Sequence, residues 1–296
     1  MSDKSGVNYT RVDDSYFEKR GLRRYAGVWS LWALGVGAVI SGHFSGWNLG
    51  LSNGWGSMFI ATIIIATMYL GLTFSLAEMS PALPHTGGAY SFARTAMGPW
   101  GGFLTGLSEN VEYVLTPAVI VFFISSYMGS IFGTPTEMLP LWWIGFYILF
   151  VVTSVHDRDV ESLTAKSLYL TLGAMNVAAD GTMLADGNGP FLPKGFVGIL
   201  ACLPFAVWLF LAIEQLPLAA EESVDPKRDM PKGIIAGIFT LIISAFMILW
   251  LNPSVAGIGS HKLASSGEPL LDGLKAIYGD GIAKTLATVA VLGLIA

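Results

Sequence analysis

Charged side chains are scarce in this chain. They make up 12% of its 296 residues, which is about half of their share in ordinary soluble domains. Apolar residues make up 53%, and the mean hydropathy is +0.61. This composition excludes an ordinary soluble globular protein and places the chain in the membrane class. The net charge of -5 is spread out without a basic stripe, so we expect no nucleic acid partner.

Several other signals are missing. The single cysteine, Cys202, excludes an internal disulfide. The first 26 residues are polar and lack the apolar core of a cleaved signal peptide, so the first apolar run is expected to act as an uncleaved anchor. The sequence holds no P-loop, no histidine–cysteine set at metal-ligand spacing and no Gly-x-Ser-x-Gly elbow. We therefore expect no enzyme activity, no metal site and no cofactor.

What the chain does contain is a series of apolar runs. A helix needs about 20 apolar residues to cross a bilayer. The candidate spans are residues 27–49, 55–77, 99–131, 139–155, 167–179, 195–220, 233–251 and a run that begins at residue 285. The fifth run is short, and the last is cut off by the end of the sequence. We predict an all-α membrane protein with a cytoplasmic tail over residues 1–26 and a transmembrane domain of about eight spans over residues 27–296.

The basic residues indicate the orientation, because they concentrate on the cytoplasmic side of membrane proteins. If all eight runs cross and the N-terminus is cytoplasmic, 12 of the 16 Lys and Arg residues lie inside. This bias favours counting the short fifth run as a crossing, since otherwise Lys227, Arg228 and Lys232 would move outside. We predict a multi-pass protein of the inner (cytoplasmic) membrane.

Small residues fill the middle of the first span, which contains Gly35, Gly37, Ser41, Gly42, Ser45 and Gly46. Glycine weakens a helix by about 1 kcal/mol per residue, so such a run has two interpretations. The small residues either let neighbouring helices pack closely or mark an unwound midpoint whose free N–H and C=O groups hold a substrate. Their number favours packing, whereas the polar His43 and Asn48 in the same stretch favour a binding site.

Two carboxylates, Glu109 and Glu112, lie within the third span. At 1.5 Å per residue they stand about 15 and 20 Å from Pro99, near the bilayer centre. Their spacing puts them on one helix face, with Tyr113 beside Glu109. A charge at that depth is costly, and such residues usually face a polar functional site. The pair would then hold a cationic substrate or relay protons; the alternative is that both are neutral or bonded to neighbouring helices as structural glue.

A third carboxylate, Glu214, lies in the sixth span between Pro204 and Pro217. Two prolines in one span remove backbone donors and disturb the helix. Membrane helices tolerate prolines that merely bend them, so a simple kink is one interpretation. The other is a broken helix whose free carbonyls, together with Glu214, meet a positive group.

Two connections between spans resemble those of a known superfamily. They are Ala77-Glu78-Met79 through Pro84 and Gly87-Gly88-Ala89-Tyr90 to Gly98-Pro99-Trp100-Gly101-Gly102-Phe103, and Ala220-Glu221-Glu222 through Asp225-Pro226-Lys227-Arg228 to Pro231-Lys232. Both are similar to the loops before the third and after the sixth span of the amino acid–polyamine–organocation (APC) superfamily. Within it, residues 16–22, 41–48, 109–113 and 212–218 most resemble ethanolamine permeases.

The resemblance implies an inverted five-plus-five repeat, the LeuT-like fold, whose first and sixth spans are broken at a central site. The first-span break, usually Gly-small-Gly, corresponds to Ser41, Gly42 and His43. In amino acid carriers its N–H groups hold the substrate carboxylate, which ethanolamine lacks. The sixth-span pattern, usually Gly-apolar-Glu, reads Ala212, Ile213, Glu214. The substrate-binding residues implied are Ser41, Gly42, His43, Glu109, Glu112, Tyr113, Ala212 and Glu214.

The function implied is secondary active import of ethanolamine or a similar small amine, driven by protons or sodium. The alternatives are an amino acid permease of the same superfamily and an amine-binding receptor, or inactive fragment, that does not transport. Superfamily members continue through about twelve spans, so we expect a fold truncated within its second repeat. The expected partners are the small amine and the lipid bilayer, and the sequence does not indicate an oligomeric state.

Overall fold

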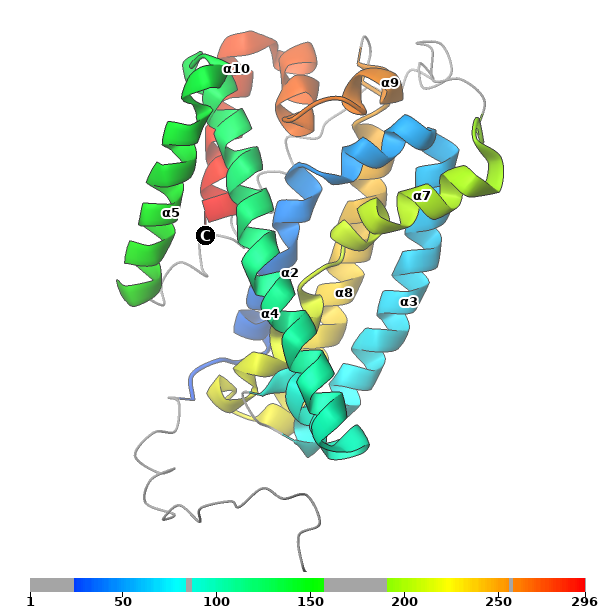
Figure 1. Ribbon diagram of the computed structural model, residues 1–296, viewed down its shortest axis with the longest axis vertical. Coiled ribbons are helices and arrows are strands. Elements are labelled where there is room, and N and C mark those ends of the chain that lie inside the picture. The colour runs from blue at the N-terminus through cyan, green and yellow to red at the C-terminus, as the bar shows by residue number, and fades with distance from the viewer. Residues whose placement is uncertain (1–23, 84–86, 157–190, 256–257, 296) are drawn as a thin grey trace, which may run out of the picture.

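The computed structural model describes residues 24–83, 87–156, 191–255 and 258–295, and in these residues the regular elements are helices (Figure 1). One isolated parallel bridge joins Ala26 to Ser223. The elements are α2 (Val28–Phe44), η1 (Trp47–Asn53), α3 (Trp55–Ala82), α4 (Gly88–Phe132), η2 (Thr136–Met138), α5 (Leu139–His156), α7 (Gly195–Trp208), η3 (Ile213–Glu222), α8 (Pro226–Leu251), α9 (Gly259–Leu263) and α10 (Pro269–Ile295). The all-α prediction is confirmed.

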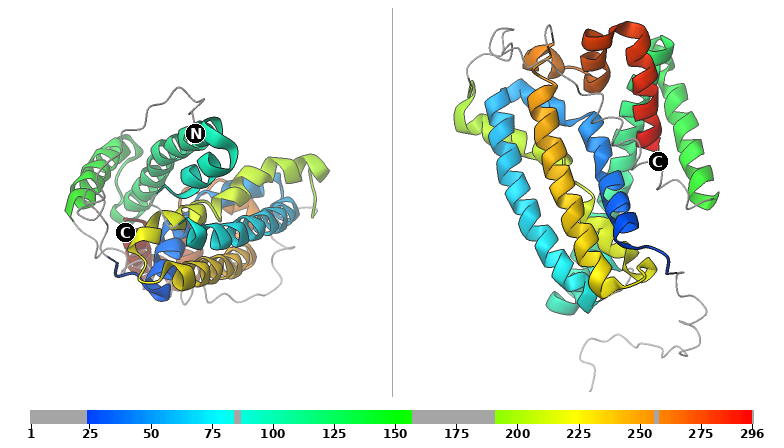
Figure 2. Two further views of the ribbon diagram at one scale, coloured as in Figure 1. Left: turned by 90° about the horizontal axis from the view of Figure 1, so that it is seen from below. Right: turned by 180° about the vertical axis from the view of Figure 1, so that it is seen from behind.

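The helices form a multi-pass membrane bundle. Four segments, α3, α4, the α7–η3 segment and α8, are long and apolar enough to cross a bilayer, and α2 with η1 forms a fifth that is bent by 44°. In addition, α5 runs beside α4, and α10 packs against α4 and α2 (Figure 1, Figure 2). These seven segments correspond to seven of the predicted spans. The predicted fifth span and the tail up to residue 23 lie outside the described residues.

A glycine in the left-handed region divides α4 in two. Gly98 has φ 76°, and the helix that crosses the bundle starts after it, at the predicted position. The short helix before it folds back onto the span, so that a Cβ at Gly102 would lie 2.9 Å from Cβ of Arg94. Tyr90 packs against Gly106 in the same way. Glycine takes a positive φ without steric penalty, which is why the chain reverses here.

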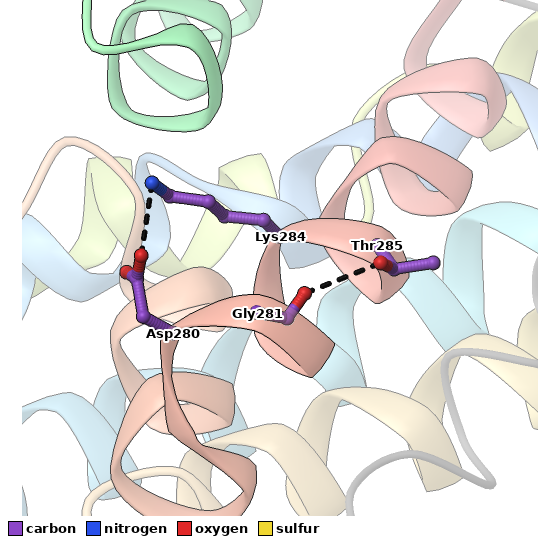
Figure 3. A network of polar contacts seen from close by, with 4 residues as sticks. All are labelled: Asp280, Gly281, Lys284 and Thr285. Atoms are coloured by element: carbon purple, nitrogen blue, oxygen red, sulfur yellow. Dashed lines mark hydrogen bonds and ion pairs between the residues drawn. The ribbon is translucent and has the colours of Figure 1, made fainter.

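A second such glycine, Gly279 with φ 77°, divides α10. The helix resumes at Asp280, which forms an ion pair with Lys284 at 2.9 Å (Figure 3). The hydrogen bond from Lys284 holds the pKa of the exposed Asp280 carboxyl below its ordinary value. The eighth helix therefore starts five residues before the predicted apolar run, because an exposed ion-paired turn precedes the run.

Segments predicted to share a side of the membrane lie at the same end of the bundle. Residues 24–26, the start of α4 and the start of α8 lie at one end, the N-terminal end; α9, the start of α7 and the start of α10 lie at the other, the loop end (Figure 1). At the N-terminal end, Tyr25 N–H donates to Glu222 O at 2.9 Å, and Val224 N–H donates to Ala26 O at 3.0 Å. The start of the first span is thereby tied to the end of the sixth.

Small residues bring the central helices close together. A Cβ at Gly35 of α2 would lie 3.0 Å from Cδ1 of Ile213, and one at Gly233 of α8 would lie 2.8 Å from Cβ of Leu31. Close backbone approach is how helices gain packing energy in lipid, where no hydrophobic force drives their association. The packing interpretation is therefore confirmed for Gly35.

Candidate functional site

The first span is broken at Ser45 and Gly46. Helix α2 ends at Phe44, Ser45 is extended, and Gly46 has φ 93°, which suits only glycine. The predicted break at Ser41, Gly42 and His43 is wrong by several residues, since these residues are helical. Gly42 serves packing instead, because a Cβ there would lie 2.2 Å from the carbonyl oxygen of Trp208.

Side chains from neighbouring elements satisfy the backbone groups of this break. The hydrogen bonds are Tyr127 Oη to Phe44 O at 2.8 Å, Trp208 Nε1 to Ser45 O at 2.9 Å, Trp47 Nε1 to His43 O at 3.2 Å, and Gly46 N to Asn48 Oδ1 at 3.0 Å. A backbone group left unpaired at membrane depth costs several kcal/mol. The break is therefore held by α4 and α7, and its Gly46 N–H is already occupied.

The sixth span is also broken, as one of the two interpretations of its prolines predicts. Helix α7 ends at Trp208, and Ala212 has φ 85°, the one positive φ of a non-glycine residue within the described part of the chain. The left-handed conformation costs an L-residue about 1–2 kcal/mol. Pro204 and Pro217 lie inside the flanking helices rather than at the break. Ala212 thus occupies a strained position two residues before Glu214.

His43 connects the two breaks. Its ring is fully buried, with 1% of its surface exposed. Nε2 lies 2.8 Å from the carbonyl oxygen of Leu209, inside the sixth-span break, and Nδ1 lies 3.1 Å from Oγ of Ser244 on α8. Of the three predicted site residues of α2, Gly42 meets Trp208 at the end of α7 and His43 contacts Leu209 and α8, whereas Ser41 precedes them on the helix.

The carboxylates of α4 and η3 face one another. Oε1 of Glu112 accepts a hydrogen bond from Nε2 of Gln215 at 2.8 Å. The adjacent Glu214 has a buried oxygen, Oε2, without a hydrogen-bond partner among the described residues. Glu112 and Glu214 are close enough to interact electrostatically, as is Glu109 with Glu112.

Two tyrosines complete this group. Tyr113 of α4 lies near all three carboxylates and is 43% exposed. Tyr69 of α3 is buried and lies near Glu214 and Glu112. We call the set Tyr69, Glu109, Glu112, Tyr113, Glu214 and Gln215 the carboxylate cluster. It brings together four of the predicted site residues from two helices that are about a hundred positions apart in the sequence.

No described basic side chain neutralises the carboxylate cluster. The ion pair between Lys284 and Asp280, which joins two described residues, lies on α10, an element outside the cluster. Carboxylates in a low-dielectric environment must be protonated or paired with a cation. The cluster can therefore bind protons or an organic cation, and its unpartnered Glu214 oxygen provides an acceptor for the latter.

Three residues of the candidate site are not predicted from the sequence: Gln215, Tyr69 and Ser244. Gln215 is a polar residue within an apolar span beside Glu214, and this signal alone could have identified it. Tyr69 and Ser244 lie in spans whose sequence gives no hint of their partners. Only the packing of α3 and α8 against the broken helices brings them to the site.

Comparison with known proteins identifies the family. The amino acid permease family profile matches residues 32–268. An uncharacterized transporter of Rhizobium meliloti (strain 1021) is 28% identical over 88% of this chain and 59% of its own length. The methylthioribose transporter and the branched-chain amino acid permease of Bacillus subtilis (strain 168) are 24% and 25% identical, over 94% and 93% of this chain and 64% of their own length. The chain thus spans about 59% to 64% of the length of these relatives, and it belongs to the amino acid permease family.

Proposed function

We propose that the protein is a secondary active permease that imports ethanolamine or a similar small amine across the inner membrane. The observation that carries this proposal is the carboxylate cluster, in which Glu112 and Glu214 approach each other without a basic partner among the described residues. A bound ammonium group offsets the repulsion between two such carboxylates and can donate a hydrogen bond to each of them. Tyr69 and Tyr113 offer aromatic faces, which also attract cations.

The broken first span supports an amine that lacks a carboxylate. An amino acid needs donors for its carboxylate as well as acceptors for its ammonium group. In this chain the Gly46 N–H at the break donates to Asn48, and Trp208 closes over the break from α7. A substrate with an ammonium group and a hydroxyl has no carboxylate, so it does not need a free N–H donor at the first-span break.

The second candidate is an amino acid permease of the same family. The relative named as a branched-chain amino acid permease favours it. Under this alternative the substrate ammonium would still meet the carboxylate cluster, and the carboxylate would displace the Asn48 side chain from Gly46. An amine receptor without transport, or an inactive fragment, is the third alternative and predicts binding without uptake.

Uptake into proteoliposomes separates these alternatives. We expect labelled ethanolamine to accumulate and excess alanine or leucine not to compete with it. Entry of labelled alanine without ethanolamine would establish the amino acid permease, and saturable binding without accumulation would establish the receptor. Glu137→Gln, which removes an exposed carboxylate on η2, is the matched control and should leave uptake unchanged.

The proposed orientation places the N-terminal end in the cytoplasm and the loop end outside. The residues at each end carry the expected charge bias, because Lys227, Arg228 and Lys232 start α8 whereas Lys262 lies on α9. A segment rich in basic residues stays cytoplasmic during insertion. In this proposal the tail over residues 1–26 is cytoplasmic, and residues 27–296 form the transporter domain.

A further inference from the structure

His43 is a titratable residue that the carboxylate cluster does not use. Its side chain is buried on α2 and has a hydrogen-bond partner on each ring nitrogen. The Leu209 carbonyl can only accept, so Nε2, at 2.8 Å, carries a hydrogen in every protonation state. The protonation state of the ring is therefore decided at Nδ1, which faces Ser244.

Ser244 can serve either state of that nitrogen. Its Oγ lies 3.1 Å from Nδ1 of His43 and 3.1 Å from the carbonyl oxygen of Leu241. When the ring is neutral, the hydroxyl donates to Nδ1. When the ring is protonated, Nδ1–H donates to Oγ and the hydroxyl turns to Leu241. No ring hydrogen bond is lost in either state, so the hydrogen bonding at Nδ1 accommodates both the neutral and the protonated ring.

Within the described part of the chain, the surroundings of the His43 ring lack a counter-charge. The elements packed against α2 and its break are α4, α7, η3, α8 and α10. Their titratable and charged groups are Tyr90, Arg94, Glu109, Glu112, Tyr113 and Tyr127 on α4; Cys202 on α7; Glu214, Glu221 and Glu222 on η3; Lys227, Arg228, Asp229 and Lys232 on α8; and Asp272, Lys275, Tyr278, Asp280 and Lys284 on α10. Among the described residues, no charged group acts electrostatically on His43. An imidazolium buried without a partner charge is costly, so the closed packing described here suits the neutral ring.

Protonation of His43 must therefore accompany a change in the packing of the helices around it. The ring bridges α2, the sixth-span break and α8, and the neighbouring Gly42 lets α2 touch Trp208 of α7 so closely that no Cβ would fit. Water can reach the ring only when these three elements separate. Proton binding and helix separation thus favour each other, which is the thermodynamic condition for coupling.

We propose that His43 is the binding site of the coupling proton, held at Nδ1 opposite Ser244. The proposal rests on the proposed transport function and names its driving ion. One proton from the external solution binds to Nδ1 while the bundle is open around His43. As α2, the sixth-span break and α8 close onto the ring, the Nδ1–H bond breaks and the proton passes to the cytoplasmic solution, so that the proton crosses the membrane with the amine.

The test compares the pH dependence of ethanolamine uptake in four proteins between about pH 5 and pH 8, the range in which histidine titrates. The parent and His261→Gln, an exposed histidine on α9, should share one pH profile. His43→Gln keeps a donor for the Leu209 carbonyl but cannot titrate, so its uptake should lose the pH-dependent component while ethanolamine binding at pH 7 stays within about threefold. Retention of the parental profile in His43→Gln overturns the proposal.

Ser244→Ala provides a second, milder test if the first variant fails to fold. It removes the acceptor for protonated Nδ1, and a bond to a charged donor is stronger than one to a neutral ring. The midpoint of the profile should therefore move toward acid by about one pH unit. If Ser244 were merely structural, its removal would change the uptake rate but leave the midpoint of the pH profile where it is. An unmoved midpoint therefore contradicts the proposal.

A measurement without substrate separates this proposal from the proposed function. Nitrogen-15 NMR of histidine-labelled protein, with His43 assigned through His43→Gln, reports the protonation of Nδ1 directly. We expect His43 to titrate in the parent and to keep titrating in Glu112→Gln. A ring that stays neutral down to about pH 5 overturns the proton site even if ethanolamine is transported, and a titrating ring supports it even if another amine is the substrate.

Discussion

Replacing Glu112 by glutamine removes one charge from the carboxylate cluster and leaves its shape. The new amide oxygen can still accept from Nε2 of Gln215, which lies 2.8 Å from Oε1 of Glu112. The bridge between α4 and η3 therefore persists, and only the attraction for a cation is lost. Since a hydrogen bond to a charged group contributes about 1.5–3 kcal/mol, ethanolamine affinity should fall about ten- to a hundredfold.

Equilibrium binding of labelled ethanolamine to the purified protein measures this loss. Glu214→Gln should weaken binding to a similar extent, because its Oε2 is the unpartnered acceptor of the cluster. The double variant should lose less than the sum of the two, since one ammonium group meets both carboxylates. The control Glu137→Gln should bind as the parent does. If both single variants bind within twofold of the parent, the carboxylates are structural and the reasoning fails.

Three further predictions concern packing and topology. Gly42→Ala should destabilise the protein by about 1–3 kcal/mol, seen as a lower melting temperature in detergent, because its Cβ would lie 2.2 Å from the Trp208 carbonyl oxygen. Ala212→Gly should raise the melting temperature, since glycine relieves a left-handed conformation that costs alanine about 1–2 kcal/mol; a lower value would contradict that strain. In a cysteine-free background, an impermeant thiol reagent on intact cells should label a cysteine at Lys262 and not one at Arg228, and labelling of Arg228→Cys would reverse the proposed orientation.

The spans could be predicted because the bilayer imposes a length. In a bilayer, an apolar run of this length must satisfy its own backbone hydrogen bonds, which favours a helix. The bounds of the described helices accordingly lie close to the predicted ones. The start of α10 differs because Asp280 and Lys284 neutralise each other in an exposed turn before the apolar run. A hydropathy pattern counts the two charges as unfavourable for a span, but it does not show that they form an ion pair.

The exact position of the first-span break could not be predicted in the same way. The sequence offers glycine at positions 42 and 46, and each position is compatible with a break. The choice depends on Trp208, which packs over Gly42 through its carbonyl and over Gly46 through its indole. That partner lies more than 160 residues away, so only the tertiary structure reveals that Gly42 is needed for contact and Gly46 for its backbone angle.

The carboxylate cluster was predictable in part. The three-residue spacing of Glu109 and Glu112 fixes a shared helix face, and the prolines around Glu214 indicate a disturbed sixth span. The approach of Glu214 to Glu112 depends on how η3 packs against α4, which no local pattern specifies. The bridging role of His43 is likewise a property of the fold, because Leu209 and Ser244 belong to other spans.

A structure determined with bound ethanolamine tests the central claim most directly. We expect ligand density between α4 and η3, with the ammonium nitrogen about 3 Å from a carboxylate oxygen of Glu112 or Glu214. Density at the first-span break, with the ammonium group distant from both carboxylates, would contradict the proposed amine site.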